Sequence, residues 1–376
     1  MELKELRDEI DRIDDEIAAL FEKRAHAAGL VAEYKRAHDM GIYQGGRENE
    51  VLERAQTKVS PELRDGVKLL FTTLMDISKC RQQQLLTEVR PLISEPEKAE
   101  PLVGAVTEGS YTADACRKFL GDNCRIKYYP DFGAVFRAVE DEAIDYGVIP
   151  IENSTAGEVS ATFDHMLRHR FYICKDTRIR INHVLAVKKG TRPEDIKTVM
   201  SHEMALRQCS RFLGEKGFAL EETASTAKAA ELVAASGDMT VAAVCSASCA
   251  KLFGLEAAAE DITDINDNYT RFIMISKDLQ IPKGASVVSL CLTVPHTAGS
   301  LYRILTRFAY CGLNLCRIES KPMPDSLAYL RDDAFDFIFF LDFIGSVKDE
   351  KVTKLLKGLE TETKFYRFLG NYEEID

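Results

Sequence analysis

An apolar repeat marks the opening ninety residues as helical. Apolar side chains recur every three or four positions, at Leu3, Leu6, Ile10, Ile13, Ile17, Leu20 and Phe21. The repeat continues through Val31 and ends near the turn Asp39–Gly46. Because a helix of this length cannot bury its apolar stripe alone, it needs other helices or a second chain to pack against.

Two further helices complete this all-α segment. The second is expected from Arg47 to about Gln56. Ser60 followed by Pro61 is typical of an N-cap with proline in the first turn, and it opens a third helix that is expected to run to about Val89. The sequence therefore predicts a helical domain over residues 1–90, built from a very long, a short and a long helix.

The pattern changes after a Pro- and Glu-rich linker, Pro91–Pro101. Short apolar segments now alternate with helical ones, and the strands are expected at Leu102–Val106, Tyr146–Ile151, His183–Lys189 and Thr240–Ser246. Such alternation is typical of an α/β domain with a mostly parallel sheet. We expect this domain to span residues 101–282.

Lys283-Gly284 marks the next boundary, and residues 286–376 form the last predicted domain. The order of its expected elements is strand 287–294, helix 298–310, strands 314–320 and 335–343, helix 347–358 and strand 364–370. This βαββαβ order is the ferredoxin-like arrangement of α+β domains.

Charge and composition limit the possible partners. The 376 residues carry a formal net charge of −11, which disfavours binding to nucleic acid or to an anionic membrane surface. Anionic substrates would need local clusters of Arg and Lys.

The N-terminus is acidic without the apolar core of a signal peptide, and no window reaches 18 apolar residues, so a cytoplasmic protein is expected.

Cysteine and histidine spacing gives no sign of a metal or another cofactor. The ten cysteines include no Cys-x-x-Cys pair, which favours reduced, mostly buried thiols. His165 and His169 are four residues apart, as in a helical metal pair, but no third ligand is evident and a solvated helix face is the better interpretation.

Cationic and amide side chains share helix faces in the first domain. Arg24 and Lys35 are eleven residues apart, about three turns, and Ser78 and Gln82 are one turn apart. With Leu6-Arg7, Glu22–Arg24, Lys35, Arg47–Arg54 and Ser78–Gln83, the segment resembles the all-helical chorismate mutase family. An alternative is a helical dimerisation hairpin with scattered surface charges.

The resemblance implies a role for each polar residue. Arg7, Arg24 and Arg47 clamp the two carboxylates of chorismate, while Lys35 and Gln82 bind its ether oxygen. Glu48 meets the ring hydroxyl, Ser78 lies at the edge of the site, and Gln44 stands where the family commonly has Asp. These residue types suit an intramolecular rearrangement, which needs a held geometry and stabilisation of negative charge on the breaking C–O oxygen, with no nucleophile.

Spacing also indicates a second subunit. Arg7 and Arg24 are seventeen residues apart on one helix, roughly 25 Å along its axis and about 100° in rotation. One helix cannot bring both to one small ligand, so Arg7 is expected from a partner chain. The intertwined dimer implied by the resemblance agrees, and a homodimer or homotetramer is predicted.

Three polar motifs stand in the α/β domain: Ile149–Gly157, Ser201–Cys209 and Asn268–Phe272. Singly, each could be a cap or a turn. Together with Gly109–Cys116, Ala224–Ala230 and Cys245–Leu255, they resemble prephenate dehydratase over residues 102–280. That family forms two α/β lobes around a cleft, like a type II periplasmic binding protein, so a solute-binding module is an alternative that the missing signal peptide disfavours.

The resemblance implies loss of carbon dioxide and of the ring hydroxyl from prephenate, beside a proton donor, Thr270. Threonine is a poor acid and needs hydrogen-bonded neighbours. The candidates are Glu152, Asn153, Ser154, Thr155, Ser201 and Gln208. Arg271 is a possible carboxylate anchor, although strand neighbours alternate in direction.

The last domain resembles the ACT domains that follow prephenate dehydratases. The similarity lies in His296–Leu301 and Gly312–Pro322, although Ser300 and Lys321 replace the usual Ala and Arg. By this resemblance L-phenylalanine binds between two such domains and inhibits. The implied effector contacts are Gly299, Ser300, Leu301, Asn314, Leu315, Glu319 and Ser320.

The sequence thus predicts an isomerase and a lyase in one chain, converting chorismate to prephenate and prephenate to phenylpyruvate in phenylalanine biosynthesis. Arogenate dehydratase activity is a near alternative. A phenylalanine-binding regulatory protein without catalysis is a more distant one, disfavoured by the intact set of Thr270, Glu152, Arg24 and Lys35.

Overall fold

The structure is a computed structural model that describes residues 2–38, 40, 45–88, 92–154, 157–158, 160–265, 267–325, 327 and 337–376. The chain divides into two compact units. Met1–Leu92 and Val288–Phe368 form the first, and Ile93–Val287 with Leu369–Asp376 form the second.

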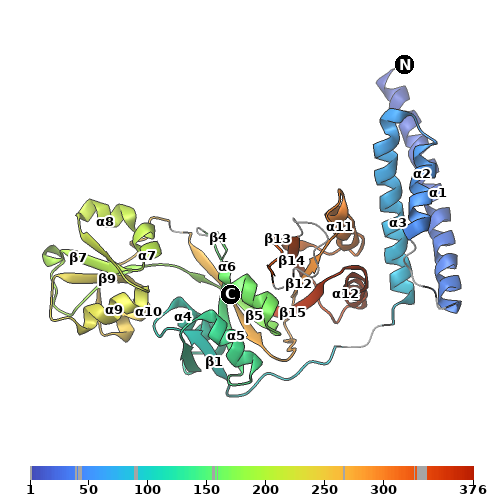
Figure 1. Cartoon of the computed structure of the whole chain (residues 1–376). Helices are drawn as coiled ribbons and strands as arrows, with labels where there is room; N and C mark the ends of the chain where they lie inside the picture. The colour runs from blue at the N-terminus through green and yellow to red at the C-terminus, as the bar shows by residue number, and fades with distance from the viewer. Residues whose placement is uncertain are drawn as a thin grey trace. The chain divides into compact units, whose positions relative to one another are not determined.

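In the N-terminal part of the first unit, the described residues form three α-helices, which confirms the predicted all-α segment. They are α1 (Leu3–Ala37), α2 (Gly45–Gln56) and α3 (Arg64–Leu86), with a 3₁₀ turn at Pro61–Leu63. Figure 1 shows α1 and α3 running side by side with α2 against them. Ser60 is the cap of the 3₁₀ turn and Pro61 its first residue, so α3 begins three residues later than the motif alone suggests.

The C-terminal part of the first unit has the predicted βαββαβ order. Its elements are β12 (Val287–Thr293), α11 (Ser300–Tyr310), β13 (Leu315–Pro322), β14 (Phe337–Ile344), α12 (Glu350–Glu362) and β15 (Tyr366–Ile375). The strands lie in the order β13-β14-β12-β15, so β13 is an edge. Leu290, Phe308, Leu341 and Leu355 are among the buried residues that join the sheet to both helices.

The second unit is two-lobed. The first lobe contains β1 (Leu102–Val106), α4 (Tyr111–Leu120), β2 (Arg125–Tyr129), α5 (Phe132–Glu140), β3 (Tyr146–Asn153), β4 (Gly157–Glu158), α6 (Ser160–Arg168), β5 (Tyr172–Arg180) and β11 (Tyr269–Ser276). Its strand order is β5-β11-β3-β1-β2, and Glu373–Ile375, the end of β15 that belongs to this second unit, pairs with β5.

The second lobe lies between β5 and β11 in the sequence. It contains β6 (Val184–Val187), β7 (Thr198–Ser201), α7 (Glu203–Gln208), α8 (Ser210–Lys216), β8 (Ala219–Glu222), α9 (Thr226–Ala235), β9 (Val241–Cys245), α10 (Ala247–Leu252) and β10 (Glu256–Ala259). The strand order is β10-β6-β9-β7-β8. Figure 1 shows the two lobes as separate α/β layers joined by two chain crossings.

The two lobes share one topology. In each, the strand that follows a crossing from the other lobe (β11 or β6) is inserted antiparallel to both neighbours, beside a parallel group of three. The expectation of a mostly parallel sheet is therefore wrong: both sheets are mixed, because the returning chain enters each sheet from the opposite end. The predicted two-lobed, type II periplasmic-binding-protein-like architecture is confirmed.

Candidate functional site

A cavity of about 250 Å³ lies among α1, α2 and α3. Its lining joins cations and amides to apolar side chains: Arg24, Ala28, Val31, Lys35, Arg47, Glu48, Val51, Met75, Ser78, Lys79 and Gln82. Six of the polar residues predicted from the sequence thus meet at one cavity, because helical spacing brings Arg24 and Lys35 of α1 to one side and Ser78 and Gln82 of α3 to the other.

Arg24 is fixed across the helix pair. Its Nη1 donates to Ser78 Oγ at 2.6 Å and to the Leu74 carbonyl oxygen at 2.9 Å. Burial lowers the pKa of this guanidinium from its usual value. Since arginine stays charged in proteins, the cavity keeps a preoriented cation that can bind a carboxylate.

Lys35, Glu48 and Lys79 form the charged floor of the cavity. Lys79 Nζ lies 2.7 Å from Glu48 Oε1, and Lys35 is 7% exposed. Burial lowers the pKa of Lys35, Glu48 opposes that shift, and Lys79 adds to it. Arg303 of α11, in the same unit, contacts Glu48 at 3.3 Å and Asp76 at 2.9 Å. Glu48 is therefore held by two cations, Lys79 and Arg303.

The remaining predicted residues of this site differ in placement. Gln82 is buried, and its Oε1 has no hydrogen-bond partner among the described residues. Arg47 lines the cavity but is exposed and paired with Glu50 at 2.8 Å. Arg7 is exposed on α1 and does not line the cavity, and Gln44 lies outside the described residues.

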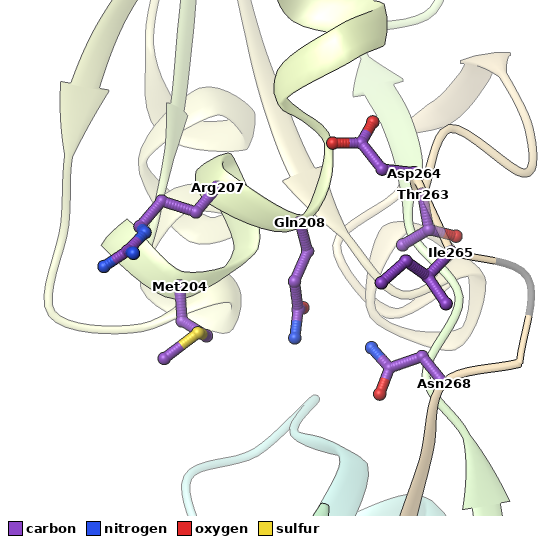
Figure 2. Close-up of a pocket in the computed structure, with 7 residues that line it drawn as sticks. All are labelled: Met204, Arg207, Gln208, Thr263, Asp264, Ile265 and Asn268. Atoms are coloured by element: carbon purple, nitrogen blue, oxygen red, sulfur yellow. The ribbon is translucent and has the colours of Figure 1, made fainter. Parts of the chain in front are cut away.

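A second cavity, of about 440 Å³, lies in the two-lobed unit between α7 and the segment that leads to β11. Met204, Arg207 and Gln208 line it from α7; Thr263, Asp264, Ile265 and Asn268 line it from the other side. In Figure 2, the amides of Gln208 and Asn268 extend toward the same opening. The cavity therefore offers one cation, one carboxylate and two amides at its wall.

Thr270 is linked to this wall by hydrogen bonds. Asn153 Nδ2 donates to Thr270 Oγ1 and to Asn268 Oδ1, each at 2.9 Å. The pairing of Thr270 with Asn153 in the β11–β3 register brings the two side chains together. Because Thr270 Oγ1 accepts from Asn153, the hydroxyl proton of Thr270 is left to be donated elsewhere.

Ser154 supports the same segment. Its Oγ accepts from the Tyr269 amide at 2.9 Å and donates to the Asp267 carbonyl oxygen at 3.1 Å. The end of β3 is thus tied to the start of β11 on the Thr270 side. Thr155 lies outside the described residues.

Two predicted residues, Ser201 and Glu152, are placed away from Thr270. Ser201 is fully buried in β7 and its hydroxyl donates to the Val244 carbonyl oxygen at 2.6 Å, so its proton is used within the sheet. Glu152 pairs in register with Arg271, and alternation along the strand turns that pair to the opposite sheet face from Asn153 and Thr270. The sequence prediction that groups Ser201 and Glu152 with Thr270 is therefore corrected, because neither side chain faces the Thr270 hydroxyl.

Arg271 has a partner within its own unit. Its Nε contacts Asp176 Oδ2 at 2.5 Å and its Nη2 donates to the Tyr372 hydroxyl at 3.0 Å. Asp176 is 2% exposed, so its ion pair with the Arg271 guanidinium is a structural contact within the sheet. Its expected role as a substrate anchor does not agree with this arrangement.

A third cavity, of about 320 Å³, opens at the start of α11. Its lining includes Ser300, Leu301, Phe337 and Phe339. Gly299 caps α11 with a φ of 85°, a conformation that favours glycine. The other predicted effector residues, Asn314, Leu315, Glu319 and Ser320, lie on or beside the edge strand β13, where Glu319 pairs with Arg317 and Lys321.

Comparison with known proteins decides the family. The model of the family Chorismate mutase type II matches residues 6–83, and that of Prephenate dehydratase matches residues 107–280. A bifunctional chorismate mutase/prephenate dehydratase from Aquifex aeolicus is 34% identical over 377 residues, covering 99% of this chain and 98% of the relative. The chain belongs to the family of bifunctional chorismate mutase/prephenate dehydratases.

Two further matches cover the dehydratase part of this bifunctional chain. Arogenate dehydratase 2 of Petunia hybrida is 34% identical over 273 residues, which is 70% of this chain and 69% of the relative. A crystal structure of prephenate dehydratase from Arthrobacter aurescens, in complex with L-Phe, has a TM-score of 0.64 at 28% identity, over 72% of this chain and 89% of that chain.

The described residues of the bifunctional chain contain no group of three His, Cys, Asp or Glu side chains that could hold a metal ion. All ten cysteines are free thiols, and seven are buried. His169 Nδ1 contacts Glu140 Oε2 at 2.7 Å and its ring stacks near His165 and Phe136, so this histidine pair packs onto α5. None of the helices in the described part is long and apolar enough to span a membrane.

Sequence reasoning missed Lys79, Asp76, Asn268 and His183. Lys79 and Asp76 are buried charges on α3, beside the motif at Ser78. A charged residue on the inward face of an otherwise apolar helix stripe was the sequence signal that could have indicated them. Asn268 was visible as the first residue of the motif that contains Thr270. His183 stood at the start of an expected strand, with no neighbour in sequence to mark it.

Proposed function

We propose that this chain rearranges chorismate to prephenate in the cavity among α1, α2 and α3, and dehydrates prephenate to phenylpyruvate beside Thr270. The mutase reaction is supported by the position of Arg24, Lys35 and Gln82, which line one cavity. The dehydratase reaction is supported by the hydrogen bond from Asn153 to Thr270 Oγ1, because Asn153 also bonds Asn268 on the cavity wall.

In the mutase reaction, the ether C–O bond breaks as a C–C bond forms within one molecule. Arg24 grips a carboxylate, and the ammonium of Lys35 with the amide of Gln82 binds the ether oxygen as negative charge builds on it. Arg47 covers the open side and binds the second carboxylate. Glu48, held by Lys79, accepts a hydrogen bond from the ring hydroxyl.

In the dehydratase reaction, the ring carboxylate leaves as carbon dioxide, its electrons enter the ring, and the ring hydroxyl departs. That hydroxyl must receive a proton to leave as water. Asn153 fills the acceptor position of Thr270 Oγ1 and so directs its O–H toward the leaving group. Arg207 and Asn268 on the cavity wall are suited to hold the side-chain carboxylate.

The experiment is a product assay with the purified chain. Chorismate should be converted to phenylpyruvate through prephenate, and prephenate alone should give phenylpyruvate. Failure on both substrates would exclude the proposal, and success on one alone would limit it to that domain.

Arogenate dehydratase activity is the second candidate, favoured by the similarity to the Petunia hybrida protein of that name. Arogenate carries an amino group where prephenate carries a keto group. Comparing kcat/KM for the two substrates decides between them, and we expect prephenate to be preferred because the chain also contains the mutase that makes it.

We also propose that the protein is a homodimer or a larger even assembly in the cytoplasm. On α1, the exposed fractions of Leu3, Leu6, Ile10, Ile13, Ile17 and Leu20 run from 43% to 64%. This stripe suits a second copy of α1, and the same pairing supplies Arg7 to the partner's cavity.

Subunit mixing tests that pairing. Arg7→Ala and Arg24→Ala dimers should each lack mutase activity, but mixed dimers regain one intact site. Activity should return to about a quarter of wild type at equal mixing, since half the dimers are mixed and each has one good site of two. Absence of recovery after subunit exchange has been verified would contradict the shared site.

L-phenylalanine is the proposed effector, held at the start of α11. The free N–H groups of a helix start and the phenyl rings of Phe337 and Phe339 suit its carboxylate and side chain. The exposed edge strand β13 of a second copy would bring Asn314 and Ser320 to the same cavity. Titrating L-phenylalanine against both activities tests this assignment.

A further inference from the structure

Tyr111, His183 and Gln208 form a hydrogen-bonded chain between the two lobes. Tyr111 begins α4 in the first lobe, His183 lies on the crossing just before β6, and Gln208 ends α7 in the second lobe. The Tyr111 hydroxyl lies 3.2 Å from His183 Nδ1, and His183 Nε2 lies 3.2 Å from Gln208 Oε1. The chain ends at the dehydratase cavity, since Gln208 lines it.

His183 is well placed to hold Gln208. Its side chain is 2% exposed and its ring contacts that of Tyr111 edge-on, with centroids 5.8 Å apart. The backbone of Gln208 is fixed separately, by the hydrogen bond from the Asp264 amide to its carbonyl oxygen at 2.7 Å. The amide orientation of Gln208 is therefore left to its side-chain partner, His183.

The protons available decide which end of Gln208 faces the ring. The Tyr111 hydroxyl donates its single proton to the Asn182 carbonyl oxygen at 2.6 Å, so toward His183 it accepts. Nδ1 of His183 must then carry a proton. Burial lowers the pKa of His183, which keeps the ring neutral and leaves Nε2 as an acceptor.

A neutral ring with its proton on Nδ1 requires a donor from Gln208. The N and O of a side-chain amide exchange places by a half-turn about the last bond. With Gln208 Oε1 facing His183 Nε2, this contact would need a second proton on the buried ring. Turning the amide satisfies all three contacts and directs the Gln208 carbonyl oxygen into the cavity.

We propose that His183, held by Tyr111, is a positioning residue of the dehydratase site that sets the orientation of the Gln208 amide. The proposal rests on the proposed dehydratase function. It also gives a role to two residues that the proposed reaction does not use, Tyr111 of the segment Gly109–Cys116 and His183 just before β6.

Two amide variants separate positioning from simple packing. In His183→Gln, the amide reaches toward the former Nε2 position and can still bond Gln208. In His183→Asn, the shorter amide lies near the former Nδ1 position and keeps only the Tyr111 contact. We expect His183→Asn to lower dehydratase kcat/KM roughly tenfold, the loss of about one hydrogen bond, and His183→Gln to retain most of it.

A double-mutant cycle completes the test. His183→Asn should add little to the loss caused by Gln208→Ala, because both remove the same interaction. Equal losses in His183→Gln and His183→Asn, or fully additive losses with Gln208→Ala, would overturn the proposal. Thermal unfolding is measured for each variant to identify any that fails to fold. If His183→Asn does not fold, the activity of His183→Gln tests the proposal. Prephenate turnover by the wild type is measured first, so failure of the proposed function is recognised separately.

Discussion

Lys79 and Glu48 meet at 2.7 Å beneath the mutase cavity, from two helices whose contact residues are 31 positions apart. The side chain of Lys79 is 7% exposed and that of Glu48 is 16% exposed. A carboxylate withdrawn from water to this extent depends on its cation to offset the cost of burial and to hold its orientation.

Replacing Lys79 with Met should therefore reduce mutase activity. Glu48 loses its closest partner, and a hydrogen bond to a charged group contributes about 1.5–3 kcal/mol, so mutase kcat/KM should fall at least tenfold. Lys68→Met, an exposed lysine on the same helix, is the matched control and should have no effect. Unchanged mutase activity in Lys79→Met would show that Glu48 needs no such partner.

Asn153→Asp should impair the dehydratase alone. The substitution preserves shape but removes the amide donor to Thr270 Oγ1 and to Asn268. We expect dehydratase kcat to fall about tenfold to a hundredfold, the range for losing one or two orienting hydrogen bonds, with the mutase unaffected. Asn123→Asp, at an exposed position, is the control. Wild-type dehydratase rates in Asn153→Asp would refute the orienting role.

The pH dependence of the mutase should report Lys35. Because burial lowers the pKa of this ammonium, and the reaction needs its charged form, kcat/KM should decline as pH rises through that lowered pKa. Lys35→Arg should be slower but lack this alkaline decline, since arginine stays protonated. In Lys79→Met the decline should move to higher pH, because a neighbouring positive charge is gone. An identical alkaline limb in Lys35→Arg would assign the titration to another group.

Gly299→Ala should weaken inhibition by L-phenylalanine while leaving both activities intact. Gly299 has a φ of 85°, and a side chain there costs about 1–2 kcal/mol, which is relieved by shifting the first turn of α11. Gly312→Ala is the matched control, because Gly312 has a φ of 69° just beyond the far end of the same helix. Equal sensitivity to L-phenylalanine in both variants would place the effector elsewhere.

Local patterns explain how much of the fold the sequence could predict. The helices of the first domain and the βαββαβ order of the last follow from periodicity and caps, which depend on near neighbours. The reversed strands β6 and β11 could not be predicted, because an apolar run such as Val184–Val187 carries no sign of its direction. That direction is set by the crossing that delivers the chain to the sheet.

The candidate-site residues differ in predictability for the same reason. Arg24, Lys35, Ser78 and Gln82 were predictable because each pair shares a helix face. The contact of Lys79 with Glu48 and that of His183 with Gln208 join separate elements, so no spacing in the sequence indicates them. Glu152 was misplaced for the opposite reason: it is next to Asn153 in sequence, and strand alternation turns it away.

The most direct test of two separate catalytic sites in one chain is a crossed pair of variants assayed on both substrates. Thr270→Ala should lose dehydratase turnover and keep wild-type mutase rates, while Arg24→Ala should lose mutase turnover and still convert prephenate to phenylpyruvate. Dehydratase activity that survives in Thr270→Ala, or mutase activity that survives in Arg24→Ala, would contradict this account.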